Sequence, residues 1–274
     1  MRGVILALLL AAGTPERIIS TAPSITEMLY DLGLGNRVVA VTMYCHYPPE
    51  VRQKPKIGTY LNPDLEAMLA ARPDLIVALE RATNLKDKLP ALGIPVLELK
   101  NDTVADILES MTELGRRAGV EARARERVAA IRADLRAIEE RAAKRPRRSV
   151  MFVVGRTPGT VQDLIVVGGG AYLSELLEKA GGHNVFADAR VTYPKVSREE
   201  VLARRPEVIL DMGDMADTDV ITQAHRRSVE ELWKRAAPWA QVYAVASDVF
   251  VVPGPRVAEA ARELARRIQP EAGW

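Results

Sequence analysis

Cysteine and histidine are scarce in this 274-residue chain, which has one cysteine and three histidines. A single thiol, Cys45, cannot form an internal disulfide or a cysteine metal cluster. The histidines, His46, His183 and His225, lack the spacing of metal ligands. The chain has no Gly-x-Ser-x-Gly elbow, and Cys45 beside His46 is not a catalytic pair, because such partners meet in space. The sequence therefore predicts no catalytic residue, no intrinsic cofactor and no structural metal.

An excess of charge of one sign and long apolar spans are also missing. The 38 basic and 36 acidic residues leave a net charge of +2, which gives no electrostatic footprint for nucleic acid. No segment after the N-terminus is apolar over the length that a membrane-spanning helix needs. Apolar residues nevertheless make up 48% of the chain, which is enough for two domains with cores of their own.

The N-terminal residues 1–13 have the composition of a compact signal peptide. Arg2 supplies one positive charge, residues 4–12 are apolar, and the small residues Ala11, Ala12 and Gly13 follow. No cysteine comes after this segment, so a lipid-anchored form is not indicated. We expect export to the periplasm or another extracytoplasmic space; a buried first strand is the alternative.

Residues 120–144 contain no glycine or proline and are rich in strong helix formers. About 25 helical residues span roughly 37 Å, enough to join two small domains. We therefore expect a linking helix within residues 119–146, and only a small closing motion between lobes that one helix connects. A surface helix of a single domain and a coiled-coil arm are the alternatives. Apolar residues recur at steps of four and three and predict its buried stripe: Ala124, Val128, Ile131, Leu135, Ile138 and Ala142.

Short apolar runs alternate with helical patterns on both sides of this helix, which is typical of strand–helix–strand units. The sequence predicts an α/β fold of two Rossmann-like lobes, 14–118 and 147–274, each with a mainly parallel sheet flanked by helices. The predicted strands cover residues 17–20, 38–42, 75–79, 96–99, 150–154, 208–211, 241–246 and 249–252. The predicted helices in the lobes cover residues 24–32, 63–71, 86–92, 104–117, 171–180, 197–203, 225–236 and 255–268.

Three helix starts carry capping signals. Ser24 followed by Glu27, and Ser197 followed by Glu200, have the spacing of a capping box. Asn62 before a proline is a favourable N-cap for the helix at 63–71. We expect these helices to begin at those residues.

The two lobes resemble each other in sequence. Residues 66–77 align without gaps on residues 199–210, and residues 27–36 align on residues 175–184, in the same order. Two similar lobes on one helix imply a cleft between their tips. Ligands of open parallel sheets lie beyond the carboxyl ends of the strands.

Tyrosines stand at the expected strand ends. Tyr60 and Tyr193 each lie six residues before a matching glutamate, Glu66 and Glu199, and Tyr44 follows the strand at 38–42. A tyrosine ring offers a large flat face with a polar end, which suits a broad planar ligand. The alternative is that each ring covers the core of its own lobe.

At these positions the chain resembles the helical-backbone substrate-binding proteins of ABC importers, which serve uptake of cobalamin, ferric siderophores and heme. The resemblance covers nearly the whole chain after the signal-like segment, and it is closest to the cobalamin-binding members. Five segments carry it in order: 17–27 (RIISTAPSITE), 44–49 (YCHYPP), 62–76 (with NPDLE and RPDLI), 181–186 (GGHNVF) and 196–199 (VSRE).

The resemblance implies a role for each matching residue. Tyr44 would stack on the ligand from the first lobe. Tyr60 and Tyr193 stand where the cobalamin-binding members carry Trp, and they would face the ligand from opposite lobes. Pro23 would line the floor, and Asp248 would offer a polar contact.

The resemblance also implies a membrane partner. Glu66 and Glu199, one per lobe, stand where the family's exposed glutamates pair with arginines of the permease transmembrane subunits. Two such pairs would orient the protein over the transport path. The alternative for each is a solvated helix position. The transport role also implies a monomer.

The chain departs from the cobalamin-binding pattern at several places. Val252 stands where those members have an Arg near the ligand, and Leu79 stands where they have a third Trp. These changes leave heme as an alternative, with Tyr60 or His46 as an axial ligand. A ferric siderophore is the other alternative, with Arg81 and Arg156 meeting its negative charge.

One alternative belongs to another class of protein. A Rossmann-like metal-chelate or nucleotide enzyme would use the glycines at 168–170 as a phosphate loop and His46 as an acid or base. The sequence lacks a Gly-x-Gly-x-x-Gly after a first strand, so a tight turn explains these glycines better. The acidic residues at 211–219 lack EF-hand spacing, and we interpret them as a solvated loop.

Overall fold

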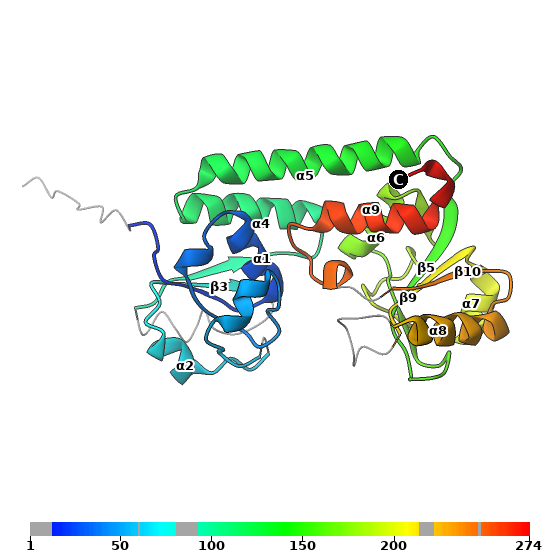
Figure 1. Cartoon of the computed structure of the whole chain (residues 1–274), viewed down its shortest axis with the longest axis horizontal. Coiled ribbons are helices and arrows are strands. Elements are labelled where there is room, and N and C mark those ends of the chain that lie inside the picture. Colours follow the sequence, from blue (N-terminus) through cyan, green and yellow to red (C-terminus); the bar gives the residue numbers. More distant parts are fainter. Residues whose placement is uncertain (1–12, 60, 81–92, 214–221, 246–247) are drawn as a thin grey trace, which may run out of the picture.

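The computed structural model describes residues 13–59, 61–80, 93–213, 222–245 and 248–274. Two lobes lie side by side beneath one long helix (Figure 1). The predicted signal-like segment, except Gly13, lies outside the described residues, as do the predicted helix at 86–92, Tyr60 and Arg81. Among the helices that are described, none is long and apolar enough to cross a membrane.

The first sheet is parallel throughout, as the sequence predicts. Its order within the described residues is β2-β1-β3-β4, with Ile18 of β1 in register with Val38 of β2 and Leu75 of β3. Most of its apolar residues are buried, because helices and loops cover both faces of such a sheet. The strands are β1 (Ile18–Ser20), β2 (Val38–Val41), β3 (Leu75–Leu79) and β4 (Val96–Leu99), and the accompanying helices are α1 (Pro23–Asp31), α2 (Leu65–Ala70) and α4 (Val104–Arg117), with short 3-10 turns η1 (Gly35–Arg37) and η2 (Pro49–Gln53).

The second sheet is mixed. Strands β7 and β9 pair parallel with β5, and β10 pairs parallel with β9. Strand β6 pairs antiparallel with β5 and β8. The order of the described strands is β10-β9-β5-β6-β8, with β7 paired to β5 off this path. The strands are β5 (Arg148–Gly155), β6 (Leu164–Val166), β7 (Gly182–Asn184), β8 (Lys195–Val196), β9 (Val208–Asp211) and β10 (Gln241–Ala244), and the helices are α6 (Tyr172–Lys179), α7 (Arg198–Arg204), α8 (Gln223–Ala236) and α9 (Val257–Ile268), with η5 (Pro270–Ala272) at the end.

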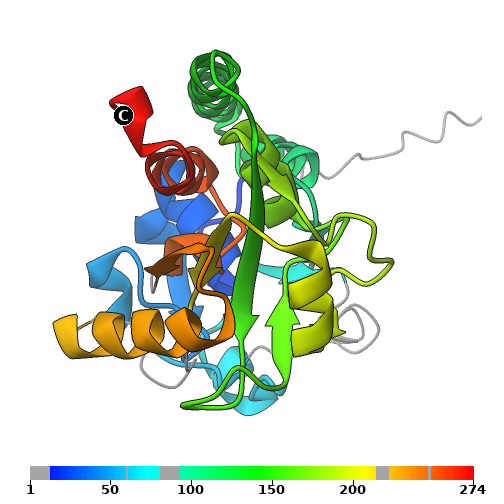
Figure 2. The ribbon, with the colours of Figure 1, turned by 90° about the vertical axis from the view of Figure 1, so that its right-hand side faces the viewer.

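Alternate residues of the second sheet face different helices. Met151 and Val153 of β5 pack in one apolar cluster with Trp233 of α8, whereas Val150 and Phe152 pack in a cluster that contains α6 and α9. This period of two is that of a strand buried on both faces. Figure 2 looks at the outer end of this lobe, with α7 and α8 on either side of β5.

The linking helix, α5 (Glu121–Ala142), is unbroken over 22 residues. It packs on α4, α6 and α9 and so lies over both lobes (Figure 1). At the α4–α5 turn, a Cβ on Gly115 would lie 2.3 Å from that of Ala124, so only glycine permits this approach. All six residues of the predicted apolar stripe are buried: Ala124, Val128, Ile131, Leu135, Ile138 and Ala142.

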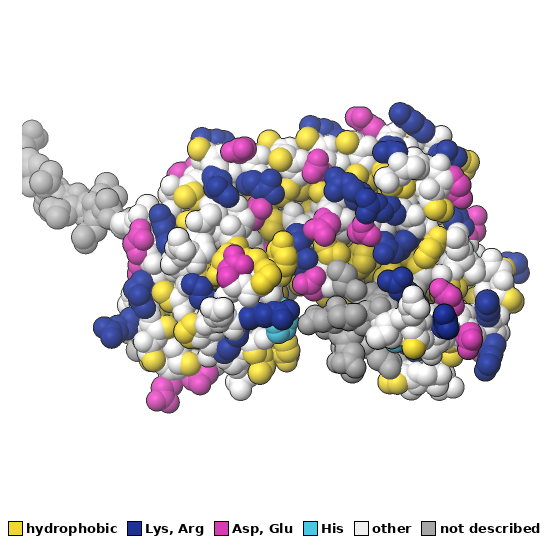
Figure 3. All heavy atoms as spheres, viewed as in Figure 1, with side chains coloured by type: hydrophobic (Ala, Val, Ile, Leu, Met, Phe, Trp, Pro, Cys, Tyr) yellow, Lys and Arg dark blue, Asp and Glu magenta, His cyan; other side chains and the backbone are white. Residues whose placement is uncertain are grey.

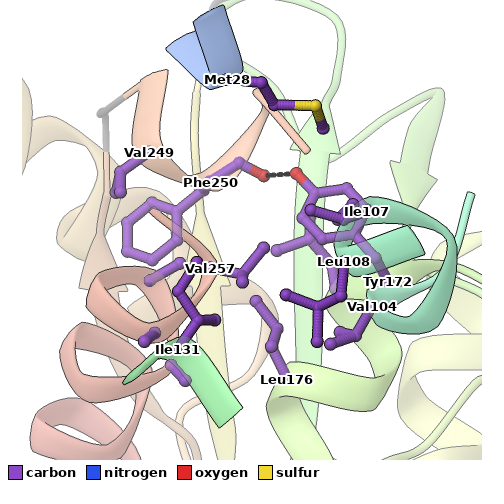
Figure 4. Close-up of a cluster of buried hydrophobic side chains, with 14 of the residues drawn as sticks. Met28, Val104, Ile107, Leu108, Ile131, Tyr172, Leu176, Val249, Phe250 and Val257 are labelled. Atoms are coloured by element: carbon purple, nitrogen blue, oxygen red, sulfur yellow. Dashed lines mark hydrogen bonds between the residues drawn. The ribbon is translucent and has the colours of Figure 1, made fainter. Parts of the chain in front are cut away.

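The lobes also share a hydrophobic core, so the helix is not their only connection. Met28 of α1, Ile107 of α4 and Ile131 of α5 lie in one buried cluster with Leu176 of α6 and Phe250 (Figure 4). These residues come from both halves of the chain. The expectation of lobes that one helix connects therefore needs correcting: the lobes are packed against each other as well as tethered.

The structure corrects several element predictions. Residues 249–252 are not a strand; η4 (Asp248–Phe250) is a 3-10 turn there. The N-cap of α1 is Ala22, with no side-chain cap, rather than Ser24. The N-cap of α2 is Asp64, which accepts from the backbone N–H groups of Glu66 and Ala67, rather than Asn62. The capping box of Ser197 and Glu200 on α7 is confirmed.

Candidate ligand site between the lobes

The candidate site lies at the carboxyl edge of the first sheet. Strand β1 leads into Pro23, which opens α1 and is half-buried. Strand β2 leads into residues 43–47, and β4 leads towards Asp102. Carboxyl ends of parallel strands meet at one edge, so these three loops converge.

The loop after β2 is anchored by its buried cysteine. The Cys45 thiol lies 3.1 Å from the hydroxyl of Thr26, which donates to it, and 3.2 Å from the hydroxyl of Thr42. The neighbours Tyr44 and His46 point the other way and are exposed, Tyr44 by 55%. Anchoring one residue of the loop thus presents its aromatic neighbours to solvent.

Tyr193 reaches this edge from the second lobe. Its side chain is 41% exposed, and it lies close enough to Asp102 for that carboxylate to raise its pKa, in addition to the larger effect of burial. The backbone N–H of Tyr172 donates to the carbonyl of Asp102 at 2.9 Å, which holds the two lobes together at this point. An exposed ring of the second lobe therefore lies within electrostatic reach of Asp102, which follows β4 in the first lobe.

The glycines at 168–170 support the Tyr193 loop. A Cβ on Gly168 would lie 2.3 Å from the carbonyl oxygen of Val191, and one on Gly169 would lie 2.3 Å from that of Ala187. The N–H of Gly168 donates to the carbonyl of Thr192 at 2.8 Å. The backbone here is packed against another loop, so close packing explains Gly168 and Gly169.

A cluster of four polar residues, Glu27, Tyr47, Asp248 and Arg256, joins the first lobe to the second. Arg256 donates from Nε to Glu27 of α1 at 2.8 Å and from its other side to Asp248 at 3.1 Å. Its guanidinium lies 4.1 Å from the centre of the Tyr47 ring. Burial raises the pKa of the Glu27 carboxyl to about 7, although Arg256 acts to lower it. Burial lowers the pKa of Arg256, but its bonds to Glu27 and Asp248 outweigh this and raise it.

The sequence interpretation missed Glu27, Arg256 and Tyr47 as members of this cluster. One signal was available: Glu27 lies between Ile25 and Met28 on the buried face of α1. A carboxylate on such a face needs a charged partner. The sequence interpretation places Glu27 in a capping box with Ser24, and so gives it no ion-pair partner.

Arg156 is held inside its own lobe. Its side chain is 4% exposed and donates from Nε to Asp211, which is fully buried. Trp233 also donates to Asp211, as does the backbone N–H of Gly213 at 2.6 Å. The prediction of a solvated acidic loop is therefore wrong for Asp211. These bonds account for the burial of Arg156 without a ligand.

Glu66 and Glu199 are both exposed at the start of a short helix. Figure 1 places α2 and α7 on different lobes, on the side away from α5. Each side chain is available to a partner. Their pairing with a permease stays a prediction.

Exposed apolar side chains occur in loops of both lobes. Figure 3 shows the surface hollowed between the lobes, on the side away from α5. Tyr60 lies outside the described residues, so the matched pair Tyr60 and Tyr193 is seen from one side only. In the rest of the chain, as described, no three His, Cys, Asp or Glu side chains are grouped to hold a metal. The exposed apolar residues of these loops are Met43, Tyr44, Tyr47, Leu61, Val191, Tyr193 and Val251.

Comparisons with known proteins agree on the family. The periplasmic binding protein family model matches residues 18–257. The vitamin B12-binding protein of Yersinia pestis (strain Pestoides F) is 30% identical over 265 residues, which cover 95% of this chain and 89% of that protein.

Solved structures share the fold. The periplasmic vitamin B12 binding protein of Vibrio cholerae is 25% identical, with a TM-score of 0.77, over 95% of this chain and 99% of that one. The apo form of the periplasmic heme-binding protein of Roseiflexus sp. RS-1 is 24% identical, with a TM-score of 0.78, over 94% of this chain and 99% of that one. Proteins with these two different ligands therefore have the architecture seen here.

Proposed function

This chain belongs to the periplasmic binding protein family, and we propose that it captures cobalamin or a related corrinoid in the cleft between its lobes. It then delivers this cargo to the permease of an ABC importer. One observation carries the proposal: each lobe presents an exposed tyrosine ring from a loop, Tyr44 after β2 in the first lobe and Tyr193 before β8 in the second.

The residues proposed to line the cleft suit a corrinoid. Tyr44 and Tyr193 supply flat faces, and Asp248, 41% exposed, supplies a polar contact to an amide side chain of the ring system. Pro23 contributes to the floor, and Tyr60 would add a further ring. A relative 30% identical to this chain is a vitamin B12-binding protein, which supports the same ligand.

Heme is the second candidate ligand. Tyrosine replaces tryptophan at Tyr60 and Tyr193, and Val252 replaces an arginine expected near cobalamin, so the resemblance to cobalamin binders is incomplete. Tyr60 or His46 would then ligate the iron. A ferric siderophore has less support, because Asp211 holds Arg156 and the other basic candidate, Arg81, lies outside the described residues.

Delivery would use the lobe tips. Glu66 and Glu199 are exposed on different lobes and would each pair with an arginine of a transmembrane subunit. The protein would act as a monomer outside the cytoplasm, without catalysis and without a cofactor of its own.

Titration with three chelates tests the ligand. Cyanocobalamin, hemin and a ferric hydroxamate siderophore are added separately to the purified protein, and quenching of tryptophan fluorescence is followed. The proposal expects saturable one-to-one binding of cyanocobalamin at micromolar concentration or below. Saturable binding of hemin alone would overturn the corrinoid proposal and support the second candidate. Binding of none of the three would overturn both.

A further inference from the structure

The Glu27–Arg256 contact is an ion pair between lobes. Glu27 lies on α1 of the first lobe, and Arg256 precedes α9, 229 positions later. Two guanidinium nitrogens, Nε and an Nη, donate to the two carboxylate oxygens. The Glu27 side chain is 2% exposed and the Arg256 side chain is 13% exposed. A paired fork of this kind fixes both distance and direction.

The remaining contacts of Arg256 lie beside a hollow that Tyr47 and Arg256 line together with residues of α1, α5 and α9. Its Nη1 atom donates to Asp248, and the face of the guanidinium lies over the ring of Tyr47. Asp248 belongs to the second lobe and Tyr47 to the first, and both side chains remain partly exposed, by 41% and 44%. One guanidinium therefore contacts a partly exposed residue of each lobe.

The backbone before Arg256 fits closely on α1. A Cβ on Gly254 would lie 3.4 Å from the Glu27 carboxylate and 3.6 Å from the carbonyl oxygen of Ser24. Nearby, the Tyr172 hydroxyl donates to the carbonyl of Phe250, beside Met28 of α1 (Figure 4). Residues 250–256 thus form a strap that crosses from the second lobe onto the first.

A charged pair is a costly way to stabilise such a strap. Removing two charges from water costs several kcal/mol, and apolar residues of similar volume commonly stabilise as well or better. What the pair adds is direction: an apolar contact tolerates sliding, whereas a bidentate bond does not. This points to a role in geometry rather than in stability alone.

We propose that Arg256 is a positioning residue between the lobes: clamped by Glu27, it fixes the spacing of the lobes and the orientation of Tyr47 and Asp248. The inference rests on the proposed function for its ligand readout, but its geometric readout needs no ligand. Arg256 acts through these two residues and is not itself a ligand contact.

The test measures lobe spacing directly. Spin labels are attached to Leu65→Cys on α2 and Leu202→Cys on α7, both exposed, while the buried Cys45 stays unlabelled. Distance distributions are recorded without ligand for the parent, Arg256→Lys and Glu27→Gln. Lysine keeps the charge but not the fork, and glutamine keeps the shape but not the charge. We expect both variants to broaden the distribution, and unchanged distributions would overturn the proposal.

The matched control is a second ion pair on α1, the helix that carries Glu27. Arg127 of α5 binds Asp31 of α1 through two bonds of 2.9 Å, but this pair joins α1 to the linking helix rather than to the strap. Arg127→Lys should leave the distribution unchanged. Broadening equal to that of Arg256→Lys would show a general loosening and overturn the positioning role.

The ligand readout separates the two proposals. Cyanocobalamin affinity should fall about tenfold or more in Arg256→Lys, within the usual range of coupling between sites, and stay at the parent value in Arg127→Lys. If the parent binds none of the three chelates, the proposed function fails while the distance measurement still decides the role of Arg256. If Arg256→Lys does not fold, Glu27→Gln and Tyr47→Leu supply the same comparison.

Discussion

The Nε atom of Arg156 lies 2.9 Å from Oδ2 of Asp211, and neither side chain has appreciable contact with solvent. Asp211 ends β9 and Arg156 follows β5, so the pair joins two neighbouring strands at their carboxyl ends. Trp233 of α8 donates to the same oxygen. The three residues tie the outer helix to the sheet.

Replacing Arg156 should therefore affect stability rather than binding. In Arg156→Met the Asp211 carboxylate keeps, among the described residues, its bonds to Trp233 and Gly213. Losing one partner of a buried pair costs about 3–5 kcal/mol. Urea unfolding measures this change. The exposed Arg235→Met on α8 is the control and should stay within about 0.5 kcal/mol of the parent. Normal stability with weakened ligand binding would instead make Arg156 a ligand contact.

The rings of Tyr44 and Tyr193 should each contribute to ligand affinity. Alanine at either position removes a stacking face, and a loss of about 1.4 kcal/mol corresponds to a tenfold weaker complex. Phenylalanine at Tyr193 keeps the ring and should bind close to the parent value. Fluorescence titration with cyanocobalamin compares the three variants. If both alanine variants bind cyanocobalamin with the affinity of the parent, the two tyrosines do not belong to the binding site.

Glu27 should make stability depend on pH. Burial raises its pKa from 4.5 to about 7 in the folded chain, where Arg256, Asp248 and Glu259 face it. Between these values the folded state binds the proton more tightly than the unfolded state, so this group lowers stability as pH rises from about 4.5 to 7. The change amounts to at most about 3 kcal/mol.

Urea unfolding at pH 5 and pH 8 measures that effect. Glu27→Gln cannot titrate, so its difference in unfolding free energy between the two pH values should be smaller than that of the parent. An identical difference would show that Glu27 titrates alike in the folded and unfolded chain.

The shared core should be sensitive at Ile131, which is 3% exposed on α5 between the lobes. Ile131→Ala should cost about 2–5 kcal/mol by loss of apolar burial and by the cavity left behind. The exposed neighbour Arg132→Ala should cost less than about 0.5 kcal/mol. Thermal or urea unfolding of both variants, followed by far-UV circular dichroism, provides the comparison.

Charge reversal at the lobe tips should affect delivery alone. Glu66→Lys and Glu199→Lys should each reduce ligand uptake through a reconstituted permease, because each replaces an attraction with a repulsion. Cyanocobalamin affinity in solution should not change. Glu109→Lys, exposed on α4, is the control. Uptake at the parent rate in both reversed variants would exclude the predicted docking.

Long periodic elements could be predicted from the sequence. The six-residue stripe of α5 is fully buried, as its spacing predicts, and strands β3, β4 and β9 occupy the predicted residues. Strands β7 and β8 could not be found, because two or three residues such as Gly182–Asn184 carry no alternating pattern. Their pairing to the sheet is decided by contacts distant in sequence.

The candidate site was predicted less completely than the fold. Exposure of Tyr44 and Tyr193 follows from loops beyond strand ends, which the sequence indicates. The partner of Glu27 could not be found, because a residue 229 positions away supplies it. Residues 249–252 are Val-Phe-Val-Val and are apolar, like a strand, yet the first two belong to a 3-10 turn whose Phe250 packs in the core between the lobes. Tertiary packing outweighed local preference there.

The apolar cluster of Figure 4 continues from one lobe into the other, so folding, rather than cargo, determines how far apart α2 and α7 stand. In the proposed role, an empty and a loaded carrier would then present nearly the same footprint to a membrane partner that contacts both tips. The two forms would compete for that partner, and the flow of cargo would depend on how strongly the loaded form outnumbers the empty one.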